Sequence, residues 1–257
     1  MYLNSRIKSH HHELKESDFD LFSSEKCSFR VSQVTSDAFT LSIKKKQDEH
    51  LEAFTERAHS IISFYLVALN VATLGHFSWD FQHVSPVPYF ISDNSDELKS
   101  HLAFYKRAGY LYDENKMSLS SELIHRSLKI MLAISKERDD VFIGEYIKGI
   151  YSLHGNFFNI NFTIESFASF YRAFEYFCTV KILKQNKLSN EKRSLESVLR
   201  NFGFEDDVLS NFGQIYNIRC SDVMHAQRGL ASQVSVDLII RLKILLDALL
   251  HRYYINL

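Results

Sequence analysis

The segment SQVSVDLIIRLKILLDALLHRYY, residues 232–254, decides the fold class of this chain. Its spacing of apolar side chains every three or four residues is typical of an α-helix. A helix that is apolar around so much of its circumference lies at the centre of a bundle or is shared with another chain. The stripe consists of Val234, Leu238, Leu242, Leu245 and Leu249, and it is widened by Ile239, Ile240, Ile244 and Leu246.

Helical spacing also dominates the chain before this segment. The sequence has 2 Pro and 8 Gly in 257 residues, which favours long helices over a turn-rich β fold. We predict a mainly α protein in which residues 139–257 form a helical bundle and residues 96–138 form a helical connector. The other predicted helices are Glu97–Ala108, Ser120–Lys136, Asp140–Leu153, Ile164–Gln185, Glu191–Phe202 and Glu205–Ile218.

Residues 1–95 predict a small α+β region of unknown role before the helices. Phe39, Leu41 and Ile43 alternate with polar neighbours, a period of two that indicates a half-buried strand. A partner strand is expected near residues 29–31, a helix over 49–75, and a further strand over 77–81. The first 25 or so residues read as a polar leader, in which His10-His11-His12 lie exposed or bind a metal adventitiously.

Charge, cysteine usage and the N-terminal residues predict a cytoplasmic protein without a membrane segment. Three cysteines without paired spacing indicate reduced thiols, and Met1–Leu14 has no apolar export segment. Residues 60–79 lack formal charges, but their apolar part of about 14 residues is shorter than a bilayer span. The net charge of -1 excludes a global field that would attract nucleic acid, so nucleic-acid binding requires a local patch.

One short motif carries the chemistry: YNIRCSDVMH, residues 216–225, which precedes the last helix. Arg219 and His225 stand six positions apart. A guanidinium can hold a phosphate and an imidazole can move a proton near neutral pH, so the pair suffices for metal-free RNA cleavage through the 2′-hydroxyl. The structural alternative is a helix cap and a surface imidazole.

Other polar residues extend this candidate site. Glu175 can orient Arg219 or His225, or it can form an ordinary buried ion pair, and Tyr216 can pack in the core or stack on substrate. Residues 181–200 contain six basic side chains against two acidic ones, which can follow a phosphate backbone or form a solvated helix surface. The basic residues assigned to RNA binding are Lys181, Lys184, Lys187, Lys192 and Arg193.

Two stretches resemble the HEPN domains, specifically the branch with an Apea-like C-terminal domain. FYRAFEYF, residues 170–177, is similar to the family's second helix, and residues 214–226 are similar to its "lY-x-iR…H" signature. The likeness covers about 115 residues, from Asp140 to Tyr254. It implies an antiparallel helical bundle, usually dimeric and often a metal-independent ribonuclease of toxin–antitoxin or antiviral systems. Arg219 and His225 fall on the family's arginine and histidine.

Cys220 departs from the family pattern, because active members often carry Asn, His or Asp after the arginine. A thiol is a weak hydrogen-bonding group. Ser221 or Asp222 would have to supply the missing hydrogen bonds, although neither stands directly after the arginine. The leading hypothesis is an endoribonuclease, a toxin or antiviral-defence effector with RNA as substrate and an antitoxin or defence-system protein as possible partner. The alternative is a non-catalytic dimerising module that binds RNA or a protein; a plain helical scaffold is a third reading.

Helix geometry favours a homodimer if Arg219 and His225 share one phosphate. Six residues along an ideal helix turn by roughly 120° beyond whole turns and advance about 9 Å, so the two side chains do not share a face. Two copies meeting across a two-fold axis would form a composite site. We predict no cofactor and no metal, since the sequence contains neither a phosphate-binding loop nor Cys/His ligands at recognised spacing.

Overall fold

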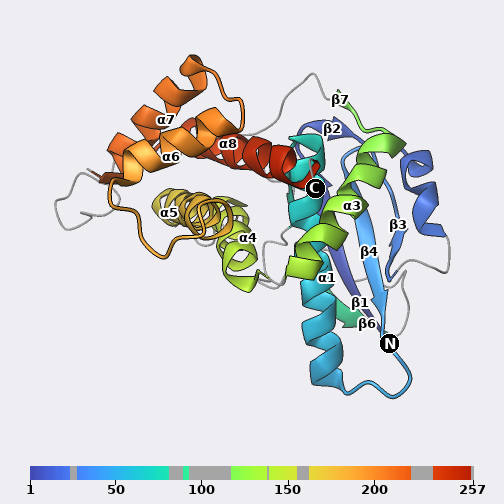
Figure 1. Ribbon diagram of the computed structural model, residues 1–257. Coiled ribbons are helices and arrows are strands. Elements are labelled where there is room, and N and C mark those ends of the chain that lie inside the picture. Colours follow the sequence, from blue (N-terminus) through green and yellow to red (C-terminus); the bar gives the residue numbers. More distant parts are fainter. Residues whose placement is uncertain are drawn as a thin grey trace. The chain divides into compact units, whose positions relative to one another are not determined.

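The computed structural model describes residues 1–23, 28–80, 89–92, 117–137, 139–154, 162–220 and 234–255. The chain divides into two compact units, Met1–Glu137 and Arg138–Leu257. The described elements are mainly helical, and a small antiparallel sheet lies in the first unit (Figure 1).

The sheet of the first unit is built around its first strand. Its order is β3-β4-β1-β5, and β6 also pairs with β1; all of these pairings are antiparallel. A second, two-stranded sheet joins β2 and β7 in parallel. The strands are β1 (Tyr2–Ser9), β2 (His12–Glu13), β3 (Arg30–Ser32), β4 (Ala38–Lys44), β5 (Phe77–Trp79), β6 (Tyr89–Ser92) and β7 (Met117–Ser118).

The expectation that the first 25 residues form a polar leader is wrong, because β1 is the central strand. Leu3 and Ile7 are buried on one face, while Asn4 and Arg6 are buried on the other. Arg6 donates to the carbonyl of Gln33 at 2.9 Å and to the hydroxyl of Thr40 at 3.2 Å. The guanidinium of Arg6 therefore binds groups of the protein instead of water. His10 and His12 are likewise buried.

Helices pack against the apolar face of this sheet. The predicted helices over 49–75 and 120–136 are confirmed as α1 (Leu51–Thr73) and α3 (Ser121–Glu137), which pack on each other. A short 3-10 helix, η1 (Glu16–Ser23), brings Phe22 against Tyr65 of α1. The predicted strands are confirmed as β3, β4 and β5. The predicted helix Glu97–Ala108 lies outside the described residues.

The second unit is a helical bundle, as predicted. α5 contacts both α4 and α8, and α6 and α7 pack on each other. After Tyr176, α5 continues as the wider π-helical turn η2, a feature that often marks functional sites. The elements are α4 (Asp140–His154), α5 (Thr163–Tyr176), η2 (Phe177–Ile182), α6 (Glu191–Asn201), α7 (Asp206–Ile218) and α8 (Val236–Ile255).

The core of the bundle explains the wide apolar stripe of α8. Exposed residues on α8 are limited to Asp237, Arg241, Ile244 and its last residue, Ile255, so the helix is central within its own chain. Phe170 and Phe174 of α5 are fully buried. Between α4 and α8, Lys243 pairs with Asp247, which also accepts a hydrogen bond from Tyr146. None of the helices in the described ranges is long and apolar enough to cross a bilayer.

Candidate functional site

Three helices of the second unit converge on Arg219, the residue that follows the last turn of α7. The Nη2 atom of Arg219 lies 3.3 Å from Oε2 of Glu191, at the start of α6, and 3.7 Å from Oε2 of Glu175, on α5. The arginine side chain is 20% exposed. A partly buried guanidinium is thus held by two carboxylates, and a substrate anion would have to compete with them.

Two tyrosine rings lie close to the guanidinium. The Cζ atom of Arg219 lies 5.3 Å from the ring centre of Tyr171 and 5.9 Å from that of Tyr216. Both distances fall within the range of cation–π attraction. The Tyr171 hydroxyl donates to Oε1 of Glu191 at 2.9 Å, which orients the carboxylate that faces Arg219. The site is therefore preorganised by aromatic packing as well as by charge.

The environment shifts the titration of the neighbouring groups. Burial, together with the negative charge of Glu191, raises the pKa of Glu175 above its ordinary value despite the nearby Arg219. Burial and the contact with Cys220 raise the pKa of Tyr216 to about 12. Burial and Glu191 also raise the pKa of Tyr171. Both phenols are consequently neutral near pH 7, and Glu175 accepts a proton more readily than an exposed glutamate.

A cavity of about 430 Å³ adjoins the two carboxylates. Its size falls within the range of small-molecule sites, roughly 300–1,000 Å³. Glu175 and Glu191 form part of its wall, so the cavity lies beside the carboxylates that hold Arg219. The remaining lining combines apolar and polar groups, among them Val141, Tyr176, Val180, Leu188, Asn186 and Lys187.

The structure brings four of the predicted site residues together. Arg219, Glu175 and Tyr216 meet as described, and the Sγ atom of Cys220 lies 3.8 Å from Nη1 of Arg219. The thiol is thus a direct neighbour of the guanidinium. Asp222 and His225 lie outside the described residues.

The five basic residues assigned to RNA binding differ in their surroundings. Lys181 forms an ion pair with Asp139, Nζ to Oδ2 at 3.0 Å. Lys187 lines the cavity, and Nζ of Lys192 lies 6.0 Å from the ring centre of Tyr216. Lys184 and Arg193 are exposed. Lys187 and Lys192 therefore contact parts of the candidate site, the cavity and Tyr216 respectively, while the charge of Lys181 is already compensated.

Sequence reasoning missed Glu191 and Tyr171 as members of the site. Glu191 is an acidic residue in the first turn of α6, directly after the capping residue Asn190, and this position alone reads as a helix start. Tyr171 belongs to the aromatic stripe of α5 and reads as core packing. Neither residue carries a local signal for its contact with Arg219, because that contact depends on how α5, α6 and α7 pack.

No known protein family, curated protein sequence or solved structure matches this chain.

Proposed function

We propose that the second unit is a metal-independent endoribonuclease of the HEPN type, which acts as a toxin or antiviral-defence effector. The observation that carries the proposal is the arrangement of Arg219. Its guanidinium is oriented by Glu175 and Glu191, which form part of the wall of a cavity, and it lies within cation–π distance of two tyrosine rings. It stands six residues before His225 in the sequence.

In the proposed reaction, Arg219 binds the scissile phosphodiester and stabilises the charge that develops on its oxygens. The 2′-oxygen forms a bond to phosphorus while the bond from phosphorus to the 5′-oxygen breaks. His225 removes the proton of the 2′-hydroxyl or delivers a proton to the leaving 5′-oxygen. The products are a 2′,3′-cyclic phosphate and a free 5′-hydroxyl.

Glu175 controls access to the guanidinium in this proposal. An incoming phosphate displaces the Glu175 carboxylate, which is the more distant partner of Arg219 at 3.7 Å. The raised pKa of Glu175 lowers the cost of that step, because the displaced group can take up a proton. Glu191, at 3.3 Å and held by Tyr171, keeps Arg219 oriented. Two copies of the chain would supply the composite site.

A second candidate function is a non-catalytic dimerising module that binds RNA or a protein partner. The neutralisation of Arg219 by two carboxylates favours it, because a compensated guanidinium attracts a phosphate less strongly than a free one. The thiol of Cys220, in place of a stronger hydrogen-bonding group beside Arg219, also favours it.

Incubation of the purified chain with total RNA in EDTA separates the two functions. An enzyme yields discrete cuts that end in 2′,3′-cyclic phosphates, and Arg219→Ala and His225→Ala each lower the rate by about 10²–10⁴-fold. Arg241→Ala removes an exposed arginine of α8 and is the matched control. His125→Ala, which removes an exposed histidine of α3, is the second.

The outcomes distinguish the candidates clearly. RNA binding that is lost in Arg219→Ala, with intact RNA for every protein, supports the binding module. Cleavage that persists in both site variants contradicts the proposed enzyme and indicates a contaminating nuclease. Expression in cells gives an independent readout, since an effector nuclease is toxic and His225→Ala is not. Sedimentation of the wild-type chain tests the homodimer.

A further inference from the structure

One end of the first sheet carries a group of polar side chains in register. Lys44 of β4 lies opposite Tyr2 of β1, and Ser42 of β4 lies opposite Arg30 of β3. Directly opposed residues point to the same face of a sheet, as do residues two apart on one strand. One face near the start of β1 is therefore shared by Tyr2, Arg30, Ser32, Ser42 and Lys44.

The two serines of this group have buried hydroxyls without a hydrogen bond. Ser42 is 1% exposed, and its Oγ atom has no hydrogen-bond partner in the described part of the chain. The same holds for the Oγ atom of Ser32. The hydroxyl of Thr40, two residues before Ser42, accepts from Arg6 at 3.2 Å and donates to the side-chain oxygen of Gln33 at 3.0 Å. Buried polar groups lack partners so rarely that the two serines need an explanation.

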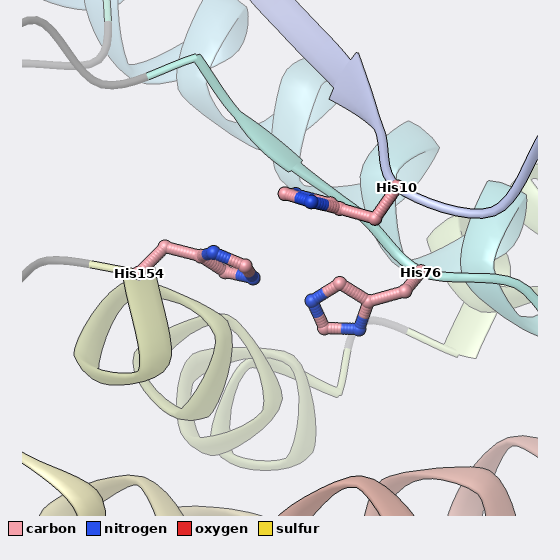
Figure 2. Close-up of side chains that lie close together, drawn as sticks. All are labelled: His10, His76 and His154. Atoms are coloured by element: carbon pink, nitrogen blue, oxygen red, sulfur yellow. The ribbon is translucent and has the colours of Figure 1, made fainter. Parts of the chain in front are cut away.

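The other end of β1 shows a buried hydroxyl whose partners are protein groups. Oγ of Ser78 lies 2.9 Å from Nε2 of His10 and donates to the carbonyl of the next residue at 3.1 Å. Figure 2 shows the His10 ring beside that of His76, and the two ring centres lie 5.0 Å apart. The third side chain labelled there, His154, belongs to the second unit. The hydroxyl of Ser42 differs from that of Ser78, because the protein supplies it with no partner.

Two cations stand on the same face as the two serines. The side chains of Arg30 and Lys44 are exposed, and neither forms an ion pair within the residues that the structure describes. Arg57 of the same unit, by contrast, pairs with Glu49 at 2.7 Å. An uncompensated guanidinium, with five donors in a fixed plane, attracts an anion, and a neighbouring ammonium adds to this attraction.

These five polar side chains line one cavity of about 660 Å³. This volume falls within the range of small-molecule sites, roughly 300–1,000 Å³. β3 stands at the end of the described sheet, so the lining includes residues from both of its faces. The strands contribute the hydroxyls and the cations, while η1 contributes Phe19, Phe22, Glu16 and Asp20. Phe29 adds a third ring, whose centre lies 5.0 Å from that of Phe22.

The charges and donors of the cavity match a phosphate group better than a carboxylate. A phosphate monoester carries a charge of about −1.5 to −2 at pH 7 and three strong acceptor oxygens. The two cations balance that charge, and the three hydroxyls can donate to the oxygens. A carboxylate would balance only one of the cations. The two acidic residues of η1 repel a second anionic group, so the remainder of the ligand is uncharged and faces the phenylalanines.

We propose that the first unit binds a small phosphate monoester that carries an aromatic ring. Arg30 and Lys44 hold the phosphate, and the Ser42 hydroxyl donates to one of its oxygens. The ring lies against Phe19 and Phe22. The phosphate thus supplies the acceptor that the buried hydroxyl lacks. All of these residues belong to the first unit, so the site is independent of the RNA chemistry proposed for the second.

Calorimetric titration of the full-length chain with phenyl phosphate tests the site. We expect one molecule per chain, bound about tenfold more tightly than inorganic phosphate because the ring buries apolar surface. Added salt weakens the binding, since the phosphate is held by charge. Failure of phenyl phosphate to bind at millimolar concentration overturns the proposal. Equal affinities for phenyl phosphate and inorganic phosphate also overturn it.

Two variants with matched controls locate the bound phosphate. Ser42→Ala removes a hydroxyl without a protein partner, so it preserves the fold and weakens phenyl phosphate binding about tenfold. Its control is Ser127→Ala, which removes a buried hydroxyl that donates to the carbonyl of Ile124, away from the cavity lining. Lys44→Ala weakens binding about fivefold, whereas Lys46→Ala, at an exposed position outside the lining, leaves it unchanged. Wild-type affinity in both Ser42→Ala and Lys44→Ala contradicts the assigned site.

Discussion

Arg219 and Glu191 form the central contact of the candidate site, with Nη2 and Oε2 separated by 3.3 Å. The two residues belong to α6 and to the end of α7, and the Tyr171 hydroxyl supports the carboxylate from α5. This contact has opposite consequences for the orientation of the guanidinium and for its affinity for a phosphate. It orients the guanidinium, and it also weakens the attraction of the guanidinium for a phosphate.

Glu191→Gln should therefore increase the affinity of the chain for RNA. The amide removes one negative charge from Arg219 while its oxygen still accepts the Tyr171 hydrogen bond. We expect about fivefold tighter binding, equivalent to ~1 kcal/mol, with a steeper dependence on salt. Fluorescence anisotropy with labelled RNA measures both. Glu196→Gln is the control: it removes one negative charge from the same helix, but from a residue that does not pair with Arg219. An equal gain in RNA affinity for the two variants would show only a general effect of net charge.

Glu175→Gln should raise the thermal stability of the chain at neutral pH. The folded-state pKa of Glu175 is raised, chiefly by burial, so its stabilising contribution is present below the unfolded pKa of about 4.3 and is lost as pH rises through the folded pKa. The wild type thus loses stability relative to the variant as pH rises above about 4. Melting curves of the wild type and the variant at pH 4 and pH 8 test this. The prediction is contradicted if the melting temperature of the variant minus that of the wild type is smaller at pH 8 than at pH 4.

The buried pair of Lys243 and Asp247 should respond very differently to single and double replacement. Lys243 is 1% exposed and Asp247 is 0% exposed. Lys243→Met leaves a buried carboxylate without its cation and should cost ~3–5 kcal/mol of unfolding free energy. Lys243→Met with Asp247→Leu should cost less, ~1–3 kcal/mol, because only the Tyr146 hydroxyl is left without its acceptor. Urea unfolding at pH 7 measures both. Equal losses in the single and double variants would mean that the pair itself stabilises the bundle.

Two glycines of α4 should give opposite results on replacement by alanine. A Cβ atom on Gly149 would meet the Phe170 ring at 2.9 Å, while one on Gly144 meets nothing within 4 Å. Gly149→Ala should lower the unfolding free energy by ~1–3 kcal/mol through overpacking. Gly144→Ala should raise it by ~0.5–1 kcal/mol, because alanine loses less backbone entropy in a helix. Similar unfolding free energies for both variants would argue against the packing of α4 on α5.

Helices with a strong apolar period were predictable from sequence, and the central strand was not. The stripe of residues 232–254 predicts a helix that the structure shows as Val236–Ile255. β1 carries Asn4 and Arg6 between its apolar residues, so it reads as polar chain. Its polar face is buried because Thr40 and the Gln33 carbonyl, far along the chain, supply the hydrogen bonds. Propensity and periodicity contain no information about such partners.

The residues of the candidate site likewise fall into those that were predictable from sequence and those that were not. Arg219, Glu175, Tyr216 and Cys220 were singled out from local motifs, and the structure brings them together. Glu191 and Tyr171 joined them only through the packing of α5, α6 and α7. Sequence alone determined which segments become helices, because that depends on residues three and four positions apart; only tertiary structure decided which charges and rings meet, because those contacts join residues that are distant along the chain.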